Sequence, residues 1–217
     1  MTETSPNLAT FPRELAAGHE GLVGRLMPTY QARLVLEDGT DAPEGGPGEL
    51  WVRGPSVMKG YHANVQATLD TIAPGGWMKT GDIVSINPEG WFSVVDRKKE
   101  LIKYKGFQVA PAELEGLLIQ HPRVLDAGVV GINDDSQATE LPRAYIVPAD
   151  SGSAAELAAE IIAWVATKAA SHKHLRGGIV VVEAIPKSPS GKILRKNLRI
   201  RANEDKDTVY GYKKAKL

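Results

Sequence analysis

The sequence predicts an α+β protein in two parts, a β-rich part with long loops followed by a small α+β domain. Before residue 96, short runs of alternating apolar residues are separated by Pro- and Gly-rich segments, as in strands joined by loops. After residue 97, apolar residues recur at helical spacing between apolar runs. The element order β-α-β-β-α-β-α favours a three-stranded sheet covered by helices. We therefore place a domain boundary at Asp96–Arg97, giving domains 1–96 and 97–217.

The first part is expected to contain short strands and one short helix. Residues 1–30 show little periodicity and are predicted to be loop. A tight hairpin is indicated by Asn87-Pro88-Glu89-Gly90, because Pro and Gly at this spacing favour a turn. The predicted strands are 32–36, 49–53, 82–86 and 91–95, and the predicted helix is 64–71.

The second part alternates helices and buried strands. Pro111 opens a helix whose first turn carries Glu113 and Glu115, which are favourable at the positive end of the helix dipole. Its apolar stripe is formed by Leu114, Leu117 and Leu118. The remaining elements are predicted as strands 124–132, 141–147 and 178–182, an amphipathic helix 154–170 and a basic helix 193–202.

Composition excludes several classes of function. The 217 residues are 42% hydrophobic, and 26 cations balance 26 anions, so bulk attraction to nucleic acid or a membrane surface is not indicated. There is no Cys, which excludes disulfides, Cys-ligated zinc and thiol nucleophiles. No apolar run approaches a membrane span of roughly 20 residues. His172 and His174 are interpreted as a solvated helix end, because no carboxylates accompany them in a metal-ligand pattern.

A basic segment lies at the domain boundary, over Val94 to Glu115. It contains several lysines among few carboxylates, and such a stretch should attract a polyanion such as a nucleotide. The alternative is a solvated basic turn. The lysines are Lys98, Lys99, Lys103 and Lys105.

Two further segments contain residues suited to nucleotide chemistry. Asp82 follows Gly81 and is expected after a tight turn at a strand start, where its two oxygens could accept both hydroxyls of a ribose; the alternative is an Asx-type turn. Pro186–Lys192 contains two Pro and a Gly, so we expect a mobile loop that can close over a ligand. Its Lys192 is a compact charge suited to a carboxylate or phosphate, the alternative being a solvated side chain.

Together with the glycine-bounded strand in Gly48–Tyr61, these segments resemble the adenylate-forming superfamily of acyl- and aryl-CoA ligases, firefly luciferase and peptide-synthetase adenylation domains. The run Lys99–Glu115, K-E-L-I-K-Y-K-G-F-Q-V-A-P-A-E-L-E, is especially similar to the 4-coumarate–CoA ligase and luciferase branch. The resemblance extends from the first residues to about Ala202.

The resemblance implies two half-reactions. A carboxylic acid attacks the α-phosphate of Mg-ATP and gives acyl-AMP and pyrophosphate. The C-terminal domain then rotates, and the thiol of coenzyme A displaces AMP. Lys99 would be the hinge, where a few residues absorb large backbone changes.

By position in the motifs, Asp82 would hold the ribose hydroxyls, and Arg97 would contact the ribose or a phosphate. Lys192 would stabilise the first transition state between acid and α-phosphate. In the second conformation two other residues, Lys103 and Gln108, would face the site. The path of coenzyme A would run along Lys105-Gly106.

Thr2-Glu3 resembles the end of the family's Y-G-x-T-E motif, whose Glu helps bind Mg²⁺ with ATP. The family's Ser/Thr/Gly-rich, Lys-bearing phosphate loop is not found in this sequence, because Gly45, Gly46 and Gly48 lack its hydroxyl residues and Lys. We therefore expect a portion of a ligase that requires an upstream domain and is inactive alone.

Two alternatives stay open at this point. One is a stand-alone module that binds nucleotide, coenzyme A or a protein without catalysis, and the other is part of a luciferase-like oxygenase. Self-association through an exposed core surface is also expected. The last residues, Ala215-Lys216-Leu217, resemble the S-K-L peroxisomal address, so the predicted location is peroxisomal or cytoplasmic.

Overall fold

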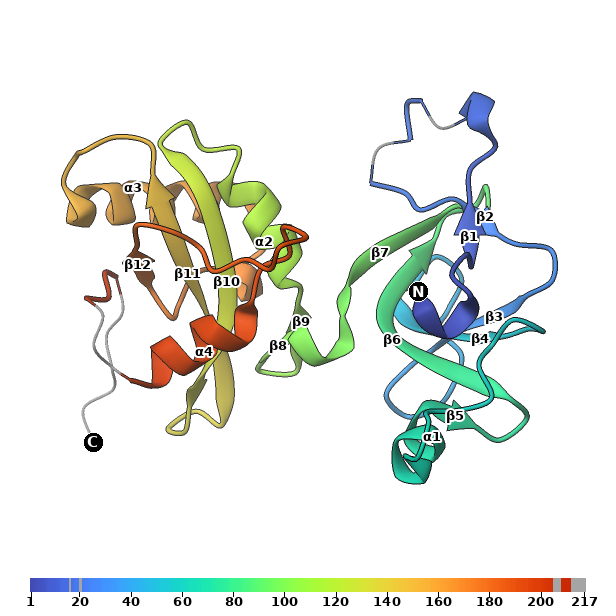
Figure 1. The fold of residues 1–217 in the computed structure, drawn as a ribbon. Coiled ribbons are helices and arrows are strands. Elements are labelled where there is room, and N and C mark those ends of the chain that lie inside the picture. The colour runs from blue at the N-terminus through green and yellow to red at the C-terminus, as the bar shows by residue number, and fades with distance from the viewer. Residues whose placement is uncertain (16, 20, 205–207, 212–217) are drawn as a thin grey trace. The chain divides into compact units, whose positions relative to one another are not determined.

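The computed structural model describes residues 1–15, 17–19, 21–204 and 208–211. The chain divides into two compact units, Met1–Lys99 and Glu100–Leu217, whose elements are labelled in Figure 1. The division lies a few residues after the predicted boundary at Asp96–Arg97. The C-terminal address Ala215–Leu217 lies outside the described residues.

The first unit is built on an antiparallel five-stranded sheet in the order β3-β4-β6-β5, with β7 paired to β6. A separate two-stranded ribbon is formed by β1 and β2. Asn64 begins the helix α1 by accepting a hydrogen bond from the backbone N–H of Ala67. The bounds are β1 Ala9–Thr10, β2 Arg25–Leu26, β3 Gln31–Val35, β4 Gly48–Arg53, α1 Val65–Thr71, β5 Ile72–Ala73, β6 Trp77–Ile86 and β7 Phe92–Arg97.

One face of this sheet forms the core of the first unit. Val52 and Met78 are fully buried there, and they are partners in the β4–β6 register. Tyr30, Leu50, Val84 and Phe92 complete the cluster. Burial of such side chains stabilises the fold by about 1.5–3 kcal/mol each.

The second unit is an α+β domain, as predicted, with a three-stranded sheet in the order β10-β11-β12 (Figure 1). β10 and β11 are antiparallel, whereas β11 and β12 are parallel and joined through α3. A β8–β9 hairpin precedes α2. The bounds are β8 Ile102–Tyr104, β9 Phe107–Val109, α2 Pro111–Leu118, β10 Val124–Asp134, β11 Thr139–Pro148, α3 Ala154–Lys168, β12 Ile179–Val181 and α4 Arg195–Asn203.

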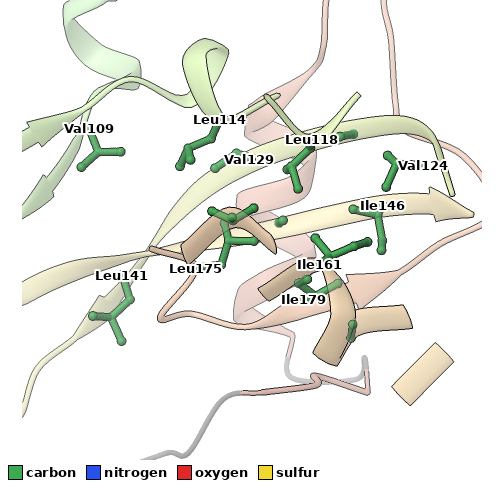
Figure 2. Packing of buried hydrophobic residues seen from close by; sticks show 14 of the residues in the cluster. Val109, Leu114, Leu118, Val124, Val129, Leu141, Ile146, Ile161, Leu175 and Ile179 are labelled. Carbon is green, nitrogen blue, oxygen red and sulfur yellow. The ribbon is translucent and has the colours of Figure 1, made fainter. Parts of the chain in front are cut away.

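Helices cover both faces of this sheet, because its strands alternate between two cores. Val129 points into a cluster with Leu118 of α2 and Ile161 of α3, shown in Figure 2. Its neighbour Val130 points into the opposite cluster, which contains Leu198 of α4. All of these side chains are 1% exposed or less. The predicted stripe on α2 is therefore a core contact.

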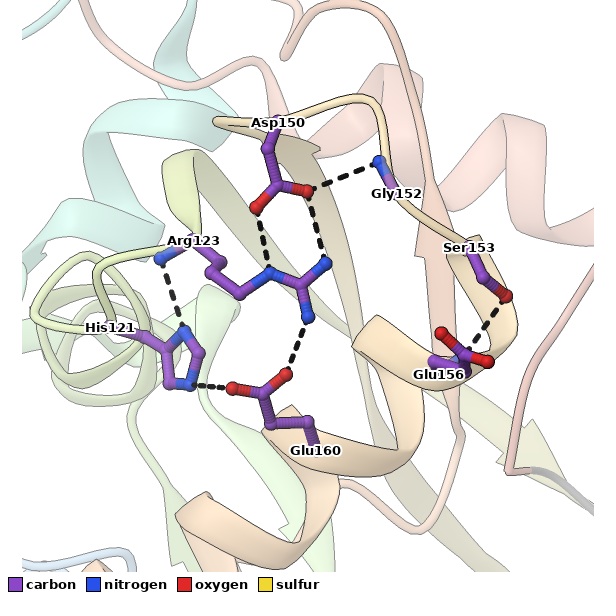
Figure 3. A network of polar contacts seen from close by, with 7 residues as sticks. All are labelled: His121, Arg123, Asp150, Gly152, Ser153, Glu156 and Glu160. Atoms are coloured by element: carbon purple, nitrogen blue, oxygen red, sulfur yellow. Dashed lines mark hydrogen bonds and ion pairs between the residues drawn. The ribbon is translucent and has the colours of Figure 1, made fainter.

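A polar network joins the start of β10 to α3 in Figure 3. The Arg123 guanidinium donates to both oxygens of Asp150, at 2.8 and 3.0 Å, and to Glu160 at 2.6 Å. Its hydrogen bonds lower the pKa of the Asp150 carboxyl. His121, 4% exposed, accepts from the Arg123 backbone N–H at Nδ1 and places Nε2 3.5 Å from Glu160. The turn after α2 is thereby fixed to α3.

The structure adds strands that the sequence analysis missed, among them β1 and β2 within residues 1–30, which we expected to be loop. Ile102–Tyr104 and Phe107–Val109 also form a hairpin, within the basic segment for which no strands were predicted. The alternation of buried Ile102, Tyr104 and Val109 with exposed neighbours around Lys105-Gly106 is the strand signal that lysine content concealed. Within the described residues, every helix is too short or too polar to cross a membrane.

Candidate functional site

Asp82 and Arg97 face each other on neighbouring strands of the first unit. They are partners in the β6–β7 register, and Arg97 Nε lies 2.7 Å from Asp82 Oδ1. The Asp82 side chain is 21% exposed and that of Arg97 53% exposed. The pair therefore presents a carboxylate and a guanidinium to solvent at one point of the sheet.

The predicted turn before Asp82 was wrong, because β6 runs without a break from Trp77 to Ile86. Glu49 pairs with Ile83 and Trp51 with Lys79, so β6 uses two more residues than β4 over this stretch. This is a bulge, and Gly81 within it has φ +71°, which favours glycine. Bulges redirect a side chain without ending a strand, and here the bulged segment carries Asp82.

A pocket of about 320 Å³ lies next to this pair within the first unit. Glu3 and Arg97 both line it, together with Glu49 and Tyr61. The Tyr61 hydroxyl donates to Glu3 Oε1 at 3.2 Å. Thr2 and Glu3 belong to a short 3₁₀ helix, Thr2–Thr4, which ends at the buried Thr4. The Thr4 carbonyl accepts a hydrogen bond from the Tyr30 hydroxyl. The structure thus brings Glu3, Arg97 and, through its ion pair, Asp82 into one region.

The chain leaves the first unit through a 3₁₀ turn, Lys98–Glu100. Lys98 Nζ lies 2.9 Å from Glu49 Oε2 of the first unit, and the Glu49 residue is 6% exposed. Lys98 is therefore paired with a carboxylate that β4 supplies from a distant part of the sequence. Glu100 pairs with Arg199 of α4 in the second unit. Lys99 thus lies between two ion-paired residues: Lys98, which is bound within the first unit, and Glu100, which is bound within the second.

Lys103 and Gln108 are direct partners in the β8–β9 register, so their side chains project from the same face of the hairpin. Lys105 and Gly106 form its turn, with φ +46° and +83°, as in a type I′ turn. The Lys103 N–H donates to Glu140 Oε2 at 2.8 Å. The hairpin is therefore held against the β10–β11 turn.

Lys192 lies in a loop that is more ordered than its composition predicts. Ser188 N–H donates to the Lys192 carbonyl at 2.9 Å, and Leu194 N–H donates to the Pro186 carbonyl at 2.8 Å. Lys187 and Ile193 also form a β-bridge. The prediction that Pro186–Lys192 is short of regular hydrogen bonds was wrong. The two prolines have no N–H to donate, but the donors in these bonds are Ser188 and Leu194. Lys192 itself is exposed at the end of this closed loop.

The Lys192 loop and the Lys103 hairpin lie at opposite ends of β10. Lys187, in the loop, pairs with Asp126 at 2.6 Å. Lys103 is bound by Glu140, the partner of Asn133. Asp126 and Asn133 are seven residues apart, or about 23 Å along a strand.

The two lysines also belong to opposite faces of the sheet. The space beside Gly128 is filled by Leu198 and Ile193, on the face covered by α4. The space beside Gly131 is bounded by Ile102 and Glu140, on the side where β8 packs. Successive odd and even positions of β10 point to opposite faces, so the loop and the hairpin do not share a surface.

Sequence reasoning missed the contacts through which four residues organise these segments, namely Glu49, Tyr61, Glu115 and Asp126. Each contacts a residue more than 45 positions away along the chain, as in the pairs Glu49–Lys98 and Asp126–Lys187. No local pattern encodes such pairings. A local signal was present only for Glu115, which lies on the same helix face as Leu118, three positions later.

The two units match two known domain families. Residues 113–192 match the AMP-binding enzyme C-terminal domain, and residues 1–62 match the AMP-binding enzyme family. The first match contains Lys192, and the second contains Glu3 and Glu49. Both matching families are families of AMP-binding enzymes.

Curated relatives and solved structures specify the class further. The chain is 45% identical over 203 residues to a putative acyl-coenzyme A synthetase of Emericella nidulans, covering 93% of this chain and 36% of that protein. It is 45% identical over 199 residues to probable 4-coumarate–CoA ligase 1 of Dictyostelium discoideum, covering 91% and 35%. The chain thus spans about a third of the length of the curated relatives it matches.

Among solved structures, the o-succinylbenzoate CoA synthetase of Bacillus subtilis with its acyl-adenylate intermediate matches with a TM-score of 0.78 and 32% identity, over 92% of this chain and 40% of that one. The anthranilate CoA ligase AuaEII with anthranoyl-AMP matches with a TM-score of 0.81 and 28% identity, over 94% and 38%. The chain therefore matches the AMP-binding enzyme families over two segments, and these solved structures that share its fold are CoA ligases holding acyl-adenylates.

Proposed function

We propose that this chain is the C-terminal portion of an ATP-dependent carboxylic acid–CoA ligase, which forms an acyl-AMP and then a thioester with coenzyme A. The observation that carries the proposal is the placement of Lys103 and Lys192 at opposite ends and on opposite faces of one small domain. Two lysines so arranged cannot both reach one reaction centre while the domain keeps a single orientation. A domain that alternates between two orientations uses each lysine in turn.

In the first half-reaction, Lys192 would stabilise the charge that develops between the acid and the α-phosphate. Because its loop is closed by its own hydrogen bonds, Lys192 would arrive by movement of the whole domain. In the second half-reaction, Lys103 and Gln108 would face the nucleotide together, as register partners. The Lys105-Gly106 turn would then line the path of coenzyme A.

In the first unit, Asp82 would accept the ribose hydroxyls of ATP or AMP, and Arg97 would contact the ribose or a phosphate. Their 2.7 Å ion pair supports this assignment, because it fixes the carboxylate while leaving part of the guanidinium exposed. Thr2 would lie beside the nucleotide in the same region as Glu3, since both belong to the 3₁₀ helix at the start of the chain.

Glu3 would supply one carboxylate to Mg²⁺ bound with ATP. In the part of the chain that the structure describes, no three His, Cys, Asp or Glu side chains gather as a metal site. A single protein carboxylate still fits this ion, which is commonly held by one or two carboxylates together with substrate phosphates and water. When bound, Mg²⁺ would neutralise phosphate charge.

Lys99 would be the hinge between the two orientations. The side chains on either side of it are tied to opposite units, Lys98 to Glu49 and Glu100 to Arg199. These anchors would confine the backbone change to very few residues, as hinges require.

The acid pocket and the phosphate loop would come from an upstream domain, so we propose that these 217 residues are inactive alone. Exposed apolar side chains beside Asp82, Val23 at 44% and Val94 at 46%, would be covered by that domain. Without it they would favour self-association.

We further propose that the protein is imported into peroxisomes through Ala215–Leu217. Deletion of these three residues would abolish import and leave the protein in the cytoplasm.

The proposal is tested by mixing the chain with a separately produced upstream fragment of the same enzyme. Acid-dependent release of pyrophosphate by the mixture, absent from either piece alone, is the expected result. Micromolar binding of ATP or coenzyme A by this chain alone, with no activity in the mixture, would instead indicate a binding module. Acid-dependent light emission or oxygen uptake would indicate oxygenase chemistry.

A further inference from the structure

The Lys192 loop is fixed to the body of the second unit at both of its stems. On one side Lys187 pairs with Asp126 at 2.6 Å. On the other, Arg195 begins α4 three residues after Lys192 and pairs with Glu115 of α2. The two carboxylates differ in burial, since the Asp126 side chain is 25% exposed and that of Glu115 only 8%. The buried pair is the firmer attachment.

The Glu115 carboxylate is fully engaged. Oε1 accepts from the backbone N–H of Val129 at 2.9 Å and from Arg195 Nε at 3.0 Å, and Oε2 accepts from Arg195 Nη2 at 2.5 Å. Two parallel bonds between a guanidinium and a carboxylate fix both orientation and distance. The contact with Val129 ties the same carboxylate to β10, an edge strand of the three-stranded sheet.

A buried ion pair is a weak source of stability, because desolvation offsets its attraction, and apolar residues of similar volume often stabilise a fold equally well. Its clearest effect here is geometric. It sets the start of α4, and thereby Lys192, relative to α2 and β10. We propose that Glu115, acting through Arg195, is a positioning residue that holds Lys192 in its orientation for adenylation. This inference rests on the proposed function of Lys192.

The first test uses the 217-residue chain and needs no activity. In Glu115→Gln, one oxygen remains for Val129, but the new amide N–H₂ faces a guanidinium donor. Amide hydrogen exchange at Ser188 and Leu194 should accelerate by about tenfold, the equivalent of losing one charge-assisted hydrogen bond. Exchange at Ala127 and Ile146 in the sheet should change less. If loop and sheet amides accelerate equally, Glu115 only stabilises the fold and the positioning role is overturned.

Two further variants guard against misfolding and unspecific effects. Arg195→Lys keeps the positive charge but cannot bind the carboxylate with two parallel bonds, so it should also accelerate exchange in the loop. Glu113→Gln is the matched control, since it removes an exposed ion pair, that with Lys173, from the same helix. Glu113→Gln should leave exchange at Ser188 and Leu194 unchanged, and an equal acceleration would overturn the proposal.

The second test uses the mixture with the upstream fragment. Glu115→Gln should lower kcat of acyl-AMP formation by about 100-fold with little change in the KM for ATP, as expected when a reacting group is misplaced. Thioester formation from supplied acyl-AMP should persist. If Lys192→Ala leaves adenylation unchanged, the proposed function itself fails. If Lys192→Ala abolishes adenylation but Glu115→Gln does not affect it, only the positioning role is overturned.

Discussion

Lys103 and Lys192 are held at opposite ends of strand β10, through Glu140 in one case and through the Lys187–Asp126 ion pair in the other. Neither lysine lies on a segment that can cross to the other's face, because one is in a hydrogen-bonded hairpin and the other in a closed loop. The domain therefore presents two cationic groups at separate places. This arrangement leads to predictions that distinguish the two ends.

The two lysines should separate the two half-reactions in the mixture with an upstream fragment. Lys192→Ala should lower acid-dependent pyrophosphate release by about 100-fold or more, because it removes a charge aimed at the developing negative charge. Lys103→Ala should leave that step largely intact and lower thioester formation from supplied acyl-AMP by a similar factor. Pyrophosphate release and coenzyme A consumption are measured separately, and equal loss of both steps in either variant would contradict the two-face scheme.

The anchor between Glu49 and Lys98 should limit the flexible part of the linker. Glu49→Gln removes the charge that binds Lys98, so the backbone order parameter at Lys98 should fall from about 0.85, typical of a rigid backbone, to below about 0.6. NMR relaxation on the 217-residue chain measures this. Asp41→Asn is the control, because it breaks the exposed Arg33–Asp41 pair in the same unit and should leave Lys98 unchanged. An unaltered order parameter in Glu49→Gln would show that the ion pair does not anchor the linker.

The Arg123–Asp150 pair should make the stability of the second unit sensitive to acid. Hydrogen bonds from Arg123 lower the pKa of Asp150 in the folded state, below the usual value of about 3.9. A lowered folded pKa contributes stability above the unfolded pKa, and that contribution is lost as pH falls through the folded pKa. The difference in urea midpoint between the native chain and Asp150→Asn should be constant from pH 7 to about pH 5 and shrink below about pH 4. A difference that grows on acidification would contradict this sign.

Sequence patterns predicted the second unit well because its elements are encoded locally. Pro111 opens α2 as expected, and Leu114 and Leu118 are buried on its core face. The strands β10 and β11 agree with the predicted apolar runs, apart from ends that extend to Asp134 and Pro148. Long apolar segments fix such elements because one face must be buried.

The candidate site was less predictable because it depends on long-range pairs. The bulge that redirects Asp82 results from the register between β4 and β6, which no single strand specifies. We expected Glu115 in the first turn of a helix, but that turn carries Glu113, and the main contact of Glu115 is Arg195, eighty positions away. The Lys192 loop gains hydrogen bonds that its Pro and Gly content does not suggest.

Two glycines of the second unit should respond to alanine with opposite signs. At Gly128 in β10, a Cβ would lie 2.8 Å from Leu198 Cδ1 and 3.3 Å from Ile185 Cγ2. Leu198 is buried on α4, so its side chain must shift within a packed core, and such overpacking costs about 1–3 kcal/mol. At Gly116 in α2, a Cβ meets nothing within 4 Å, and alanine stabilises a helix interior by about 0.5–1 kcal/mol relative to glycine. Urea unfolding should therefore show a lower midpoint for Gly128→Ala and a higher one for Gly116→Ala. A Gly128→Ala midpoint equal to that of the native chain would mean that α4 is not packed against β10 as described.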